Sequence, residues 1–445
     1  MSDHFFTLSD RPDLSADLSA GREAEGPETA AIVGIAGQVE TPAFVLSEQA
    51  VLRALVQGAR VQKESGCKLL YALKPLGHVD ALRWMVGHVD GMAASSLYEA
   101  RLAREVLAEK GTVSITSPGL RLDEIEAIAG YCDHIVCNSF PQYERFRSRL
   151  GNKTSLGLRI NPRLSFVEDE RYDPCHAGSK LGMPLEQVVE LLAHSPESLR
   201  GLQGLHFHTN CDSEIFAPLL KTVRHLDRHL APLLGRLKWM NLGGGYLLEE
   251  ETDLGPLCEA VHLLTSRYGV AVYFEPGAAL VREAGYIIAS VIDLFESDDG
   301  TIAMLDTSVN HMPEVFEYQF EPDVLGHADD GPYEYTLSGS TCLALDIFGE
   351  YCFREPLKVG SRVIFPSAGA YTMVKAHMFN GVNLPSSYTL SADGQLHLRR
   401  RYTYQDFLSR CASSAESRPA TRSGAASISP IDSVSLPQKT RRHRS

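Results

Sequence analysis

The chain has 445 residues, of which 44% are hydrophobic and 22% charged, and this composition is typical of globular proteins rather than of disordered or fibrous chains. Its formal net charge of −14 argues against a general nucleic-acid-binding protein, which would carry a basic face. No apolar run approaches the roughly 18 residues that a membrane helix needs, and we expect neither a signal peptide nor a membrane partner. Nine cysteines without a framework spacing indicate free thiols in a reducing compartment, so we expect a cytoplasmic protein.

The two ends of the chain differ from its middle. Residues 1–40 begin with a polar, irregular stretch, and we expect a mobile N-terminal extension there. Residues 411–445 carry six Lys or Arg against two Asp or Glu and almost no large apolar side chains. Such a segment cannot bury enough surface to become ordered, so we expect a disordered basic tail. The tail could contact an acidic partner, but a solvated tail is the simpler interpretation.

Between these ends, short runs rich in Val, Ile and Leu alternate with longer segments of helical period. Eight runs predict strands, at residues 68–74, 89–95, 113–117, 134–138, 155–161, 204–209, 239–243 and 272–275. Helical segments lie between them, for example at 97–109, 122–129, 185–193 and 216–234. Because strands that alternate with helices form parallel sheets, residues 46–284 predict a (β/α)8 barrel, with a doubly wound open sheet as the alternative.

The polar residues favour the barrel. Nearly every predicted strand ends in residues that are polar or that expose the backbone, among them Lys74, Arg159, His208 and Glu275. In a barrel these ends converge on one rim, where active sites lie, whereas an open sheet concentrates them near one switch point. After Tyr286 the pattern changes to strand-like runs at 287–295, 301–306, 333–337, 362–366 and 395–399 without long helices between them. We therefore expect a β-rich C-terminal domain from residues 285–405 together with residues 41–45.

Lys74 ends the first predicted strand and is followed by Pro75. A lysine at the end of a buried strand keeps its ammonium near water or a partner, or it loses its proton. Neutral lysine amines form Schiff bases with carbonyl compounds. From its position alone, Lys74 is about as well explained by a structural role as by a catalytic one.

A glycine triplet and a carboxylate end the last two predicted strands. Consecutive glycines at 243–245 let the backbone approach an anion in the usual phosphate position of such a barrel, although tight turns also use glycine. A buried carboxylate at Glu275 needs a cationic partner. That partner is either a neighbouring Arg or Lys, or the protonated pyridine nitrogen of pyridoxal phosphate (PLP).

His206 and His208 lie two residues apart on a predicted strand, so they share a face. A core histidine satisfied by its neighbours is the simplest interpretation. Zinc binding together with a rim carboxylate would make the protein a hydrolase, but no second His or Cys pair ends a neighbouring strand, and we expect no metal. Alternatively, His208 stacks on a cofactor ring. A lysine, a histidine, a glycine triplet and a glutamate on four strand ends are together the parts that a PLP-binding barrel requires.

With these residues the chain resembles the fold-type III PLP-dependent decarboxylases, relatives of alanine racemase, ornithine decarboxylase and diaminopimelate decarboxylase. The resemblance runs from about Thr41 to Tyr388 and is greatest to the carboxynorspermidine (carboxyspermidine) decarboxylases. The segments that carry it are 172–182, 242–246, 305–308, 311–315 and 339–346. It implies an alanine racemase-like TIM barrel with a C-terminal β-rich domain, PLP as the cofactor, a small polyamine acid as the substrate, and decarboxylation to norspermidine or spermidine and CO2.

The resemblance also assigns roles to individual residues. Lys74 would form the aldimine with PLP, and Cys342 would reach into the partner subunit's site and protonate the substrate, which implies a head-to-tail homodimer with shared active sites. The other residues implied to bind the cofactor are Arg159, His208, Gly243, Gly244, Gly245, Glu275 and Tyr371. The acidic residues that we expect to hold the distal amines of the substrate are Asp173, Asp306, Glu314 and Asp346.

Two positions depart from the pattern of the relatives. Ala278 stands where ornithine and diaminopimelate decarboxylases commonly carry an arginine after Glu-Pro-Gly, so the phosphate needs another cation or the glycine backbone alone. Leu343 replaces a carboxylate that binds the distal amine, which makes small diamino acids less suitable substrates. Another diamino acid such as meso-diaminopimelate remains the alternative substrate, and a non-catalytic PLP-binding regulator is disfavoured by the second domain and by Cys342.

Overall fold

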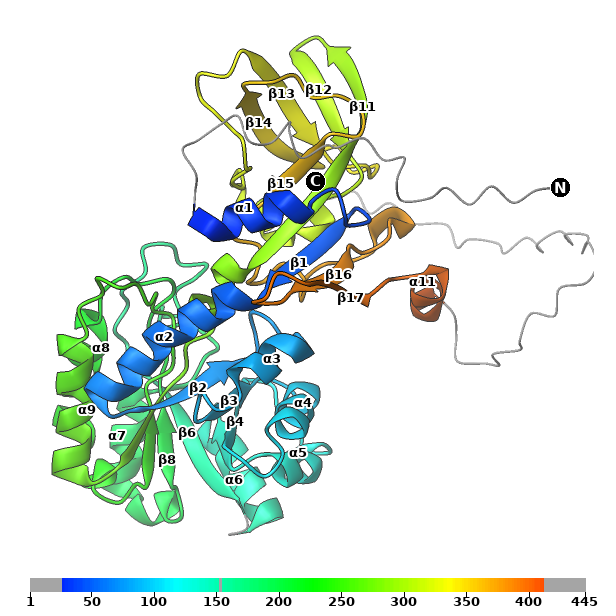
Figure 1. Ribbon diagram of the computed structural model, residues 1–445. Coiled ribbons are helices and arrows are strands. Elements are labelled where there is room, and N and C mark those ends of the chain that lie inside the picture. Colours follow the sequence, from blue (N-terminus) through cyan, green and yellow to red (C-terminus); the bar gives the residue numbers. More distant parts are fainter. Residues whose placement is uncertain (1–25, 152–153, 412–445) are drawn as a thin grey trace, which may run out of the picture. The chain divides into compact units, whose positions relative to one another are not determined.

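The computed structural model describes residues 26–151 and 154–411 (Figure 1). They belong to two compact units. The first reaches Thr403, and the second contains, within the described residues, the helix α11 (Tyr404–Cys411). Residues 1–25 of the predicted extension and 412–445 of the predicted basic tail lie outside the described residues. Among the described helices, none combines the length and apolarity that crossing a membrane requires.

Eight parallel strands form a closed barrel in the first unit (Figure 1). In chain order they are β2 (Lys68–Ala72), β3 (Gly91–Ala94), β4 (Thr112–Thr116), β5 (His134–Cys137), β6 (Ser155–Asn161), β8 (Gly204–His206), β9 (Trp239–Asn241) and β10 (Ala271–Phe274). Each strand pairs with the next, and β10 pairs with β2 to close the ring, while the short β7 (Met183–Pro184) pairs with β6. Each predicted run overlaps one barrel strand. The predicted barrel is therefore confirmed, and the open sheet is excluded.

Helices follow the strands and surround the barrel (Figure 1). They are α2 (Glu48–Ser65), α3 (Val79–Met85), α4 (Leu97–Leu107), α5 (Ile125–Tyr131), α6 (Phe140–Leu150), α7 (Leu185–His194), the 3-10 helix η3 (Pro196–Leu199), α8 (Ala217–Leu234) and α9 (Gly255–Tyr268). The helices α2, α4 and α6 each have a serine as their N-cap residue, namely Ser47, Ser96 and Ser139. Each serine side-chain oxygen accepts a hydrogen bond from a backbone N–H of the first helical turn. These polar caps mark where the apolar strands give way to helices.

Trp239 fills the barrel where its strands begin. A Cβ atom added to Gly157 or Gly204 would lie 2.3 or 2.1 Å from the Trp239 ring, so only glycine fits beside it. The indole Nε1–H donates to the hydroxyl of Ser155 at 2.8 Å, and the ring stacks on His134 with 4.5 Å between centroids. Because side chains close this end, the opposite end, where the strands finish, is the one available to a ligand.

The remaining strands form one sheet in the order β14-β13-β12-β11-β1-β16-β17, with β15 also paired to β11. Their bounds are β1 (Ala43–Ser47), β11 (Gly285–Ser297), β12 (Gly300–Leu305), β13 (Tyr333–Ser338), β14 (Ile347–Phe353), β15 (Arg362–Phe365), β16 (Ser386–Leu390) and β17 (Leu396–Arg400). Shorter helices join them, namely η4 (Ala278–Leu280), η5 (Arg282–Ala284), η6 (Val309–His311), α10 (Pro313–Tyr318) and η7 (Phe379–Gly381). The strand β1 comes from the start of the chain and lies between β11 and β16, so the predicted β-rich domain is confirmed.

The structure differs from the prediction of a mobile extension over residues 26–40. The helix α1 (Gly26–Ile35) packs on the sheet (Figure 1). Ile32, Ile35 and Val39 are buried in one cluster with Ala43 and Ile288. The physical reason is the apolar run around Ile32, which gains free energy by covering the sheet face.

Candidate active site

The carboxyl ends of the barrel strands bring the predicted site residues together. Lys74 follows β2, Arg159 lies in β6, His208 follows β8 and Glu275 follows β10. The glycine triplet 243–245 follows β9. Because all eight strands are parallel and closed, these residues share one rim. The described residues contain no group of three or more His, Cys, Asp or Glu side chains that could hold a metal ion.

Lys74 lies beside Tyr371, with its Nζ 5.7 Å from the centroid of the tyrosine ring. The side chain keeps contact with solvent, although protein surrounds it on most sides. Desolvation by the surrounding residues lowers the pKa of Lys74. The neighbouring Cys211 acts to raise this pKa, and the charge of Arg159 acts to lower it further. A lowered pKa raises the fraction of neutral amine, which is the form that attacks a carbonyl carbon.

Tyr371 comes from the loop after β15 and joins the sheet to the barrel rim. Its backbone N–H donates to the carbonyl of Pro75 at 2.9 Å, directly after Lys74. Its φ of +58° lies in the left-handed region, which a residue with a bulky side chain adopts only when its surroundings hold it there. Burial raises the pKa of Tyr371, so the side chain stays a neutral phenol. The aromatic ring is therefore held against Lys74 by its own backbone.

His208 is oriented by the glycine triplet. Its Nδ1 accepts a hydrogen bond from the N–H of Gly244 at 3.1 Å. Burial lowers the pKa of His208 well below its usual value, and the charges of Lys74 and Arg159 lower it further. A neutral ring whose Nδ1 is an acceptor carries its proton on Nε2. The structure thus fixes both the tautomer and the plane of this ring.

Close packing requires all three glycines. A Cβ atom would lie 2.4 Å from the carbonyl oxygen of Phe207 at Gly243, and 2.0 Å from that of Glu275 at Gly244. At Gly245 it would lie 2.0 Å from the oxygen of Asn210, and Gly243 and Gly245 have φ of +68° and +88°. The turn therefore leaves bare backbone between the ends of β8 and β10. Such a surface, without side chains, is one that a phosphate can approach.

Glu275 is a buried carboxylate whose two oxygens are both bound. Oε2 lies 3.3 Å from Nε2 of His206, and Oε1 accepts from Nδ2 of Asn241 at 2.6 Å. Burial acts to raise the pKa of Glu275, but the hydrogen bonds that it accepts from His206 and Asn241 outweigh this effect, and the pKa is lowered. Arg159 is also buried; burial lowers its pKa to about 10, so it remains a cation at neutral pH. The site thus contains an ionised carboxylate and a guanidinium.

Two of the predicted substrate-binding carboxylates, Asp306 and Asp346, accept hydrogen bonds from groups within the sheet domain. Asp346 is 2% exposed and accepts from the hydroxyl of Ser308 at 2.9 Å, the N–H of Val309 at 2.8 Å and the N–H of Thr341 at 3.0 Å, and it also binds the Thr341 hydroxyl. Asp306 accepts from the N–H of Ser290 at 2.8 Å, and burial raises its pKa. The bonds on Asp346 occupy both of its oxygens, whereas Asp306 accepts this one bond from the backbone, and a role of either carboxylate in binding the substrate stays a prediction.

Cys342 lies on the loop that Asp346 holds. Its side chain is exposed, and its backbone N–H donates to Oδ1 of Asn380 at 2.8 Å. Asp346 fixes one side of the loop through Thr341, and Asn380 fixes the other. The structure therefore presents this thiol on a tightly held loop.

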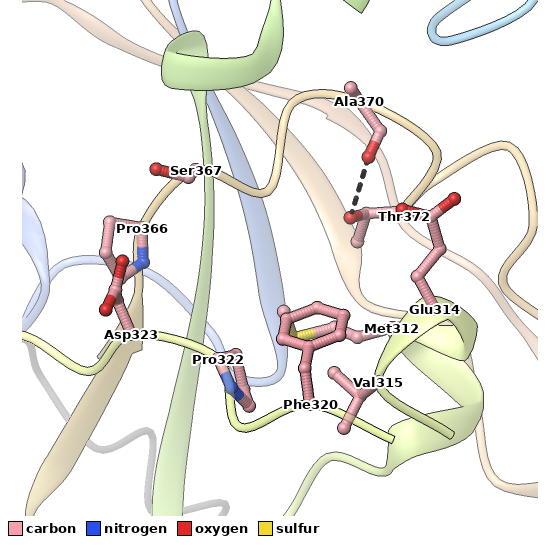
Figure 2. Close-up of a pocket in the computed structure, with 10 residues that line it drawn as sticks. All are labelled: Met312, Glu314, Val315, Phe320, Pro322, Asp323, Pro366, Ser367, Ala370 and Thr372. Atoms are coloured by element: carbon pink, nitrogen blue, oxygen red, sulfur yellow. Dashed lines mark hydrogen bonds between the residues drawn. The ribbon is translucent and has the colours of Figure 1, made fainter. Parts of the chain in front are cut away.

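Of the other two predicted carboxylates, Asp173 is buried and accepts from the N–H of Cys175 at 2.8 Å. Glu314 pairs with Lys375 at 3.2 Å, and burial raises its pKa. Glu314 also lines a pocket, whose other lining residues are Met312, Val315, Phe320, Pro322, Asp323, Pro366, Ser367, Ala370 and Thr372 (Figure 2). Ala370 and Thr372 flank Tyr371, so this pocket adjoins the loop that carries the site's tyrosine.

The structure also brings in residues that the sequence analysis did not assign to the site. Arg282 pairs with Asp212 at 2.6 Å, and the charge of Asp212 acts on Lys74. Asn241 donates a hydrogen bond to Glu275, and the thiol of Cys211 acts on the pKa of Lys74. Arg282 lies four residues after Ala278, and its ion pair with Asp212 becomes visible only in the fold.

Residues 43–369 match the family described as "Pyridoxal-dependent decarboxylase, C-terminal sheet domain". The chain belongs to this family. It is a PLP-dependent carboxy-lyase that acts on a small molecule. The carboxyaminopropylagmatine decarboxylase of Synechocystis is 35% identical over 376 residues, which cover 83% of this chain and 95% of that relative. The carboxynorspermidine/carboxyspermidine decarboxylase of Campylobacter jejuni is 33% identical over 83% of this chain and 98% of the relative.

Solved structures agree with this assignment. The crystal structure of carboxynorspermidine decarboxylase from Campylobacter jejuni, complexed with norspermidine, superposes with a TM-score of 0.75 at 32% identity and covers 84% of this chain and 100% of that chain. Diaminopimelate decarboxylase from Helicobacter pylori has a TM-score of 0.72 at 19% identity over 84% of this chain and 97% of that chain, a likeness that shows the fold.

The residues present fit PLP. The bare glycine turn suits a phosphate, Glu275 is an ionised partner for a pyridine nitrogen, and Lys74 supplies an amine of lowered pKa. Zinc binding by the two histidines is disfavoured, because each already has a different hydrogen-bond partner. His206 binds Glu275, and His208 binds the backbone N–H of Gly244.

Proposed function

We propose that the enzyme removes the α-carboxylate of carboxynorspermidine or carboxyspermidine and releases norspermidine or spermidine. The observation that carries this proposal is the similarity over nearly the whole length of the carboxynorspermidine/carboxyspermidine decarboxylase of Campylobacter jejuni, at 33% identity. Diaminopimelate decarboxylases are more distant; that of Neisseria meningitidis is 22% identical over 82% of this chain. Leu343 supports the same choice, since an apolar side chain does not hold a charged terminus close to the reacting carbon.

A second candidate substrate is carboxyaminopropylagmatine, because a decarboxylase of that name is 35% identical. The two candidates share their amino-acid end and differ at the far end, where one carries an ammonium group and the other a guanidinium group. Both ends are cations that a carboxylate can bind. We therefore propose that Glu314 and Asp173 lie toward this distal end.

The family to which the chain belongs and the geometry of the rim together support a proposed role for each site residue. When bound, PLP accepts the electron pair that the departing carboxylate leaves behind. Lys74 would provide the amine that binds the cofactor, and Gly243–Gly245 and Tyr371 would hold its phosphate. His208, whose plane is fixed by Gly244, would lie beside the cofactor ring, and Arg159 would support the same side of the site. Glu275 would keep the ring nitrogen protonated.

We propose a head-to-tail homodimer in which Cys342 of one subunit donates a proton in the other subunit's site. Two observations support this arrangement. Cys342 is exposed on a rigidly held loop, and apolar side chains around that loop are exposed as well, namely Leu345, Ile347 and Phe379 at 58%, 41% and 40%. Exposed apolar surface beside this thiol is suited to burial against a partner. All nine cysteines are free, in keeping with the cytoplasmic location that we propose.

A competition assay tests the proposed substrate. The purified holoenzyme receives carboxynorspermidine, carboxyspermidine, carboxyaminopropylagmatine and diaminopimelate together, and mass spectrometry follows the products. We expect norspermidine or spermidine to form first. Aminopropylagmatine as the first product would favour the second candidate, and lysine as the first product would contradict our interpretation of Leu343. The Lys74→Ala variant is the control for background decarboxylation.

A further inference from the structure

The two hydrogen bonds on Glu275 come from residues that lie behind it in the barrel. His206 ends β8 and is 2% exposed, and Asn241 ends β9 and is 1% exposed. Each binds a different oxygen of the carboxylate, at 3.3 Å and 2.6 Å. A carboxylate held at both oxygens has lost its freedom to rotate, so its remaining lone pairs point in a fixed direction.

His206 is a neutral donor in this arrangement. Burial lowers its pKa, and the bond to Glu275 opposes that effect without overcoming it. For its Nε2 to donate to Glu275, the proton of the neutral ring must lie on Nε2, and Nδ1 is then an acceptor. Nδ1 is buried and has no hydrogen-bond partner among the described residues. A buried polar atom without a partner destabilises a fold, so packing alone does not explain a histidine here.

Asn241 connects Glu275 to the glycine turn. Its Oδ1 accepts from the N–H of Gly243 at 2.9 Å, which directs its Nδ2 toward Glu275. The backbone N–H of Glu275 in turn donates to the carbonyl oxygen of Gly243 at 2.7 Å. One side chain therefore fixes the distance between the expected partner of the ring nitrogen and the expected phosphate position.

We propose that His206 and Asn241 are positioning residues, which hold Glu275 ionised and aimed at the ring nitrogen of the cofactor and keep it in register with the glycine turn. This inference rests on PLP binding at this site and is independent of which polyamine acid is the substrate. Loss of either donor leaves a buried carboxylate with one oxygen unbound, and such a group takes up a proton more readily.

Two substitutions of His206 separate positioning from packing. In His206→Gln the side-chain amide nitrogen occupies the place of Nε2, so a donor to Glu275 is kept. In His206→Asn the shorter side chain places its amide where Nδ1 was, and the bond to Glu275 is lost. Both side chains are polar, and asparagine is one methylene group smaller than glutamine, so the unfolding temperature of each apoenzyme is measured to account for the difference in packing. Asn241→Ala removes the second donor, and Asn210→Ala is the matched control, because Asn210 is equally buried but donates to Tyr246.

The readout is the nitrogen-15 NMR signal of enzyme-bound PLP labelled at the ring nitrogen, which reports protonation without any substrate. We expect a protonated signal in the wild type, His206→Gln and Asn210→Ala. In His206→Asn and Asn241→Ala we expect the signal to move toward the unprotonated form, with a fall of about 10- to 100-fold in kcat, the usual effect of losing a hydrogen bond to a charged group.

A protonated signal and wild-type kcat in His206→Asn would overturn the proposal for His206, and the same result in Asn241→Ala would overturn it for Asn241. Equal losses in His206→Asn and His206→Gln, together with a lowered unfolding temperature of the apoenzyme, would assign His206 a purely structural role. If His206→Asn does not fold, Asn241→Ala decides for the pair. Failure of the proposed substrate in the competition assay would leave the NMR result unchanged, so the two proposals fail separately.

Discussion

Substitution of Gly244 by alanine tests the glycine turn most sharply. The new Cβ atom would lie 2.0 Å from the carbonyl oxygen of Glu275, whereas ordinary contacts of this kind begin near 3.4 Å. The backbone must therefore separate by about 1.4 Å, and the neighbouring bond from the Glu275 N–H to the Gly243 oxygen, now 2.7 Å, would break. Overpacking of this kind costs about 1–3 kcal/mol. That cost corresponds to a fall of roughly 2–4 °C in unfolding temperature for each kcal/mol in a domain of this size.

The assay measures two quantities, the urea-induced unfolding of the apoenzyme and the affinity for PLP from absorbance titration. We expect Gly244→Ala to lose both stability and PLP affinity. Gly130→Ala is the control, because Gly130 lies in α5 with no atom within 4 Å of the added Cβ. A helical alanine should stabilise the protein there by about 0.5–1 kcal/mol and leave PLP binding unchanged. Wild-type stability and PLP affinity in Gly244→Ala would refute the claim that the turn must be bare.

Three further outcomes are expected. Asp346→Asn should destabilise the protein by ~2 kcal/mol and lower kcat more than it raises KM, because the loop that carries Cys342 loses its anchor. The control is Asp329→Asn, whose side chain is 95% exposed and which should change neither stability nor kcat. A wild-type kcat in Asp346→Asn would contradict the anchoring role. Burial lowers the pKa of His311 to about 4, so on acidification this histidine is protonated in the unfolded chain before it is protonated in the folded protein. The folded protein therefore loses free energy of unfolding as the pH falls below 6.5, by about 2 kcal/mol at pH 5. His311→Asn should show a correspondingly flatter dependence of unfolding free energy on pH between 7 and 5, and an unchanged slope would count against this assignment. Trp239→Ala should cost about 3–5 kcal/mol in urea unfolding because it empties the closed end of the barrel; a loss under 1 kcal/mol would mean that the strands collapse into the space.

The barrel was predictable because its strands are short apolar runs that each end in a polar residue or a glycine. The same pattern predicts, from the sequence alone, that Lys74, His208 and Glu275 share one rim. The helix α1 was missed because its apolar residues follow a polar, irregular stretch and show no amphipathic period, while their partners, Ala43 and Ile288, are far away in sequence or on another element.

The acidic residues show where sequence reasoning ends. Asp306 and Asp346 lie in segments that resemble those of relatives, and a carboxylate in such a segment looks the same whether it binds a substrate or a backbone N–H. The bonds from the backbone N–H groups of Ser290 and Val309 become visible only in the fold. Asn241 could not be predicted as a site residue, because an asparagine at a strand end is common and has no distinctive sequence pattern. Its role depends on its partners, Glu275 after β10 and Gly243 in the glycine turn.

The identity of the lysine that binds the cofactor tests the account most directly. The holoenzyme is reduced with borohydride, digested, and analysed by mass spectrometry for a peptide that carries a pyridoxyl group. We predict that this group is on Lys74, that Lys74→Ala carries none and releases no CO2, and that Lys68→Ala, at the start of the same strand, keeps the label. A pyridoxyl group on another lysine, or full activity in Lys74→Ala, would contradict the account.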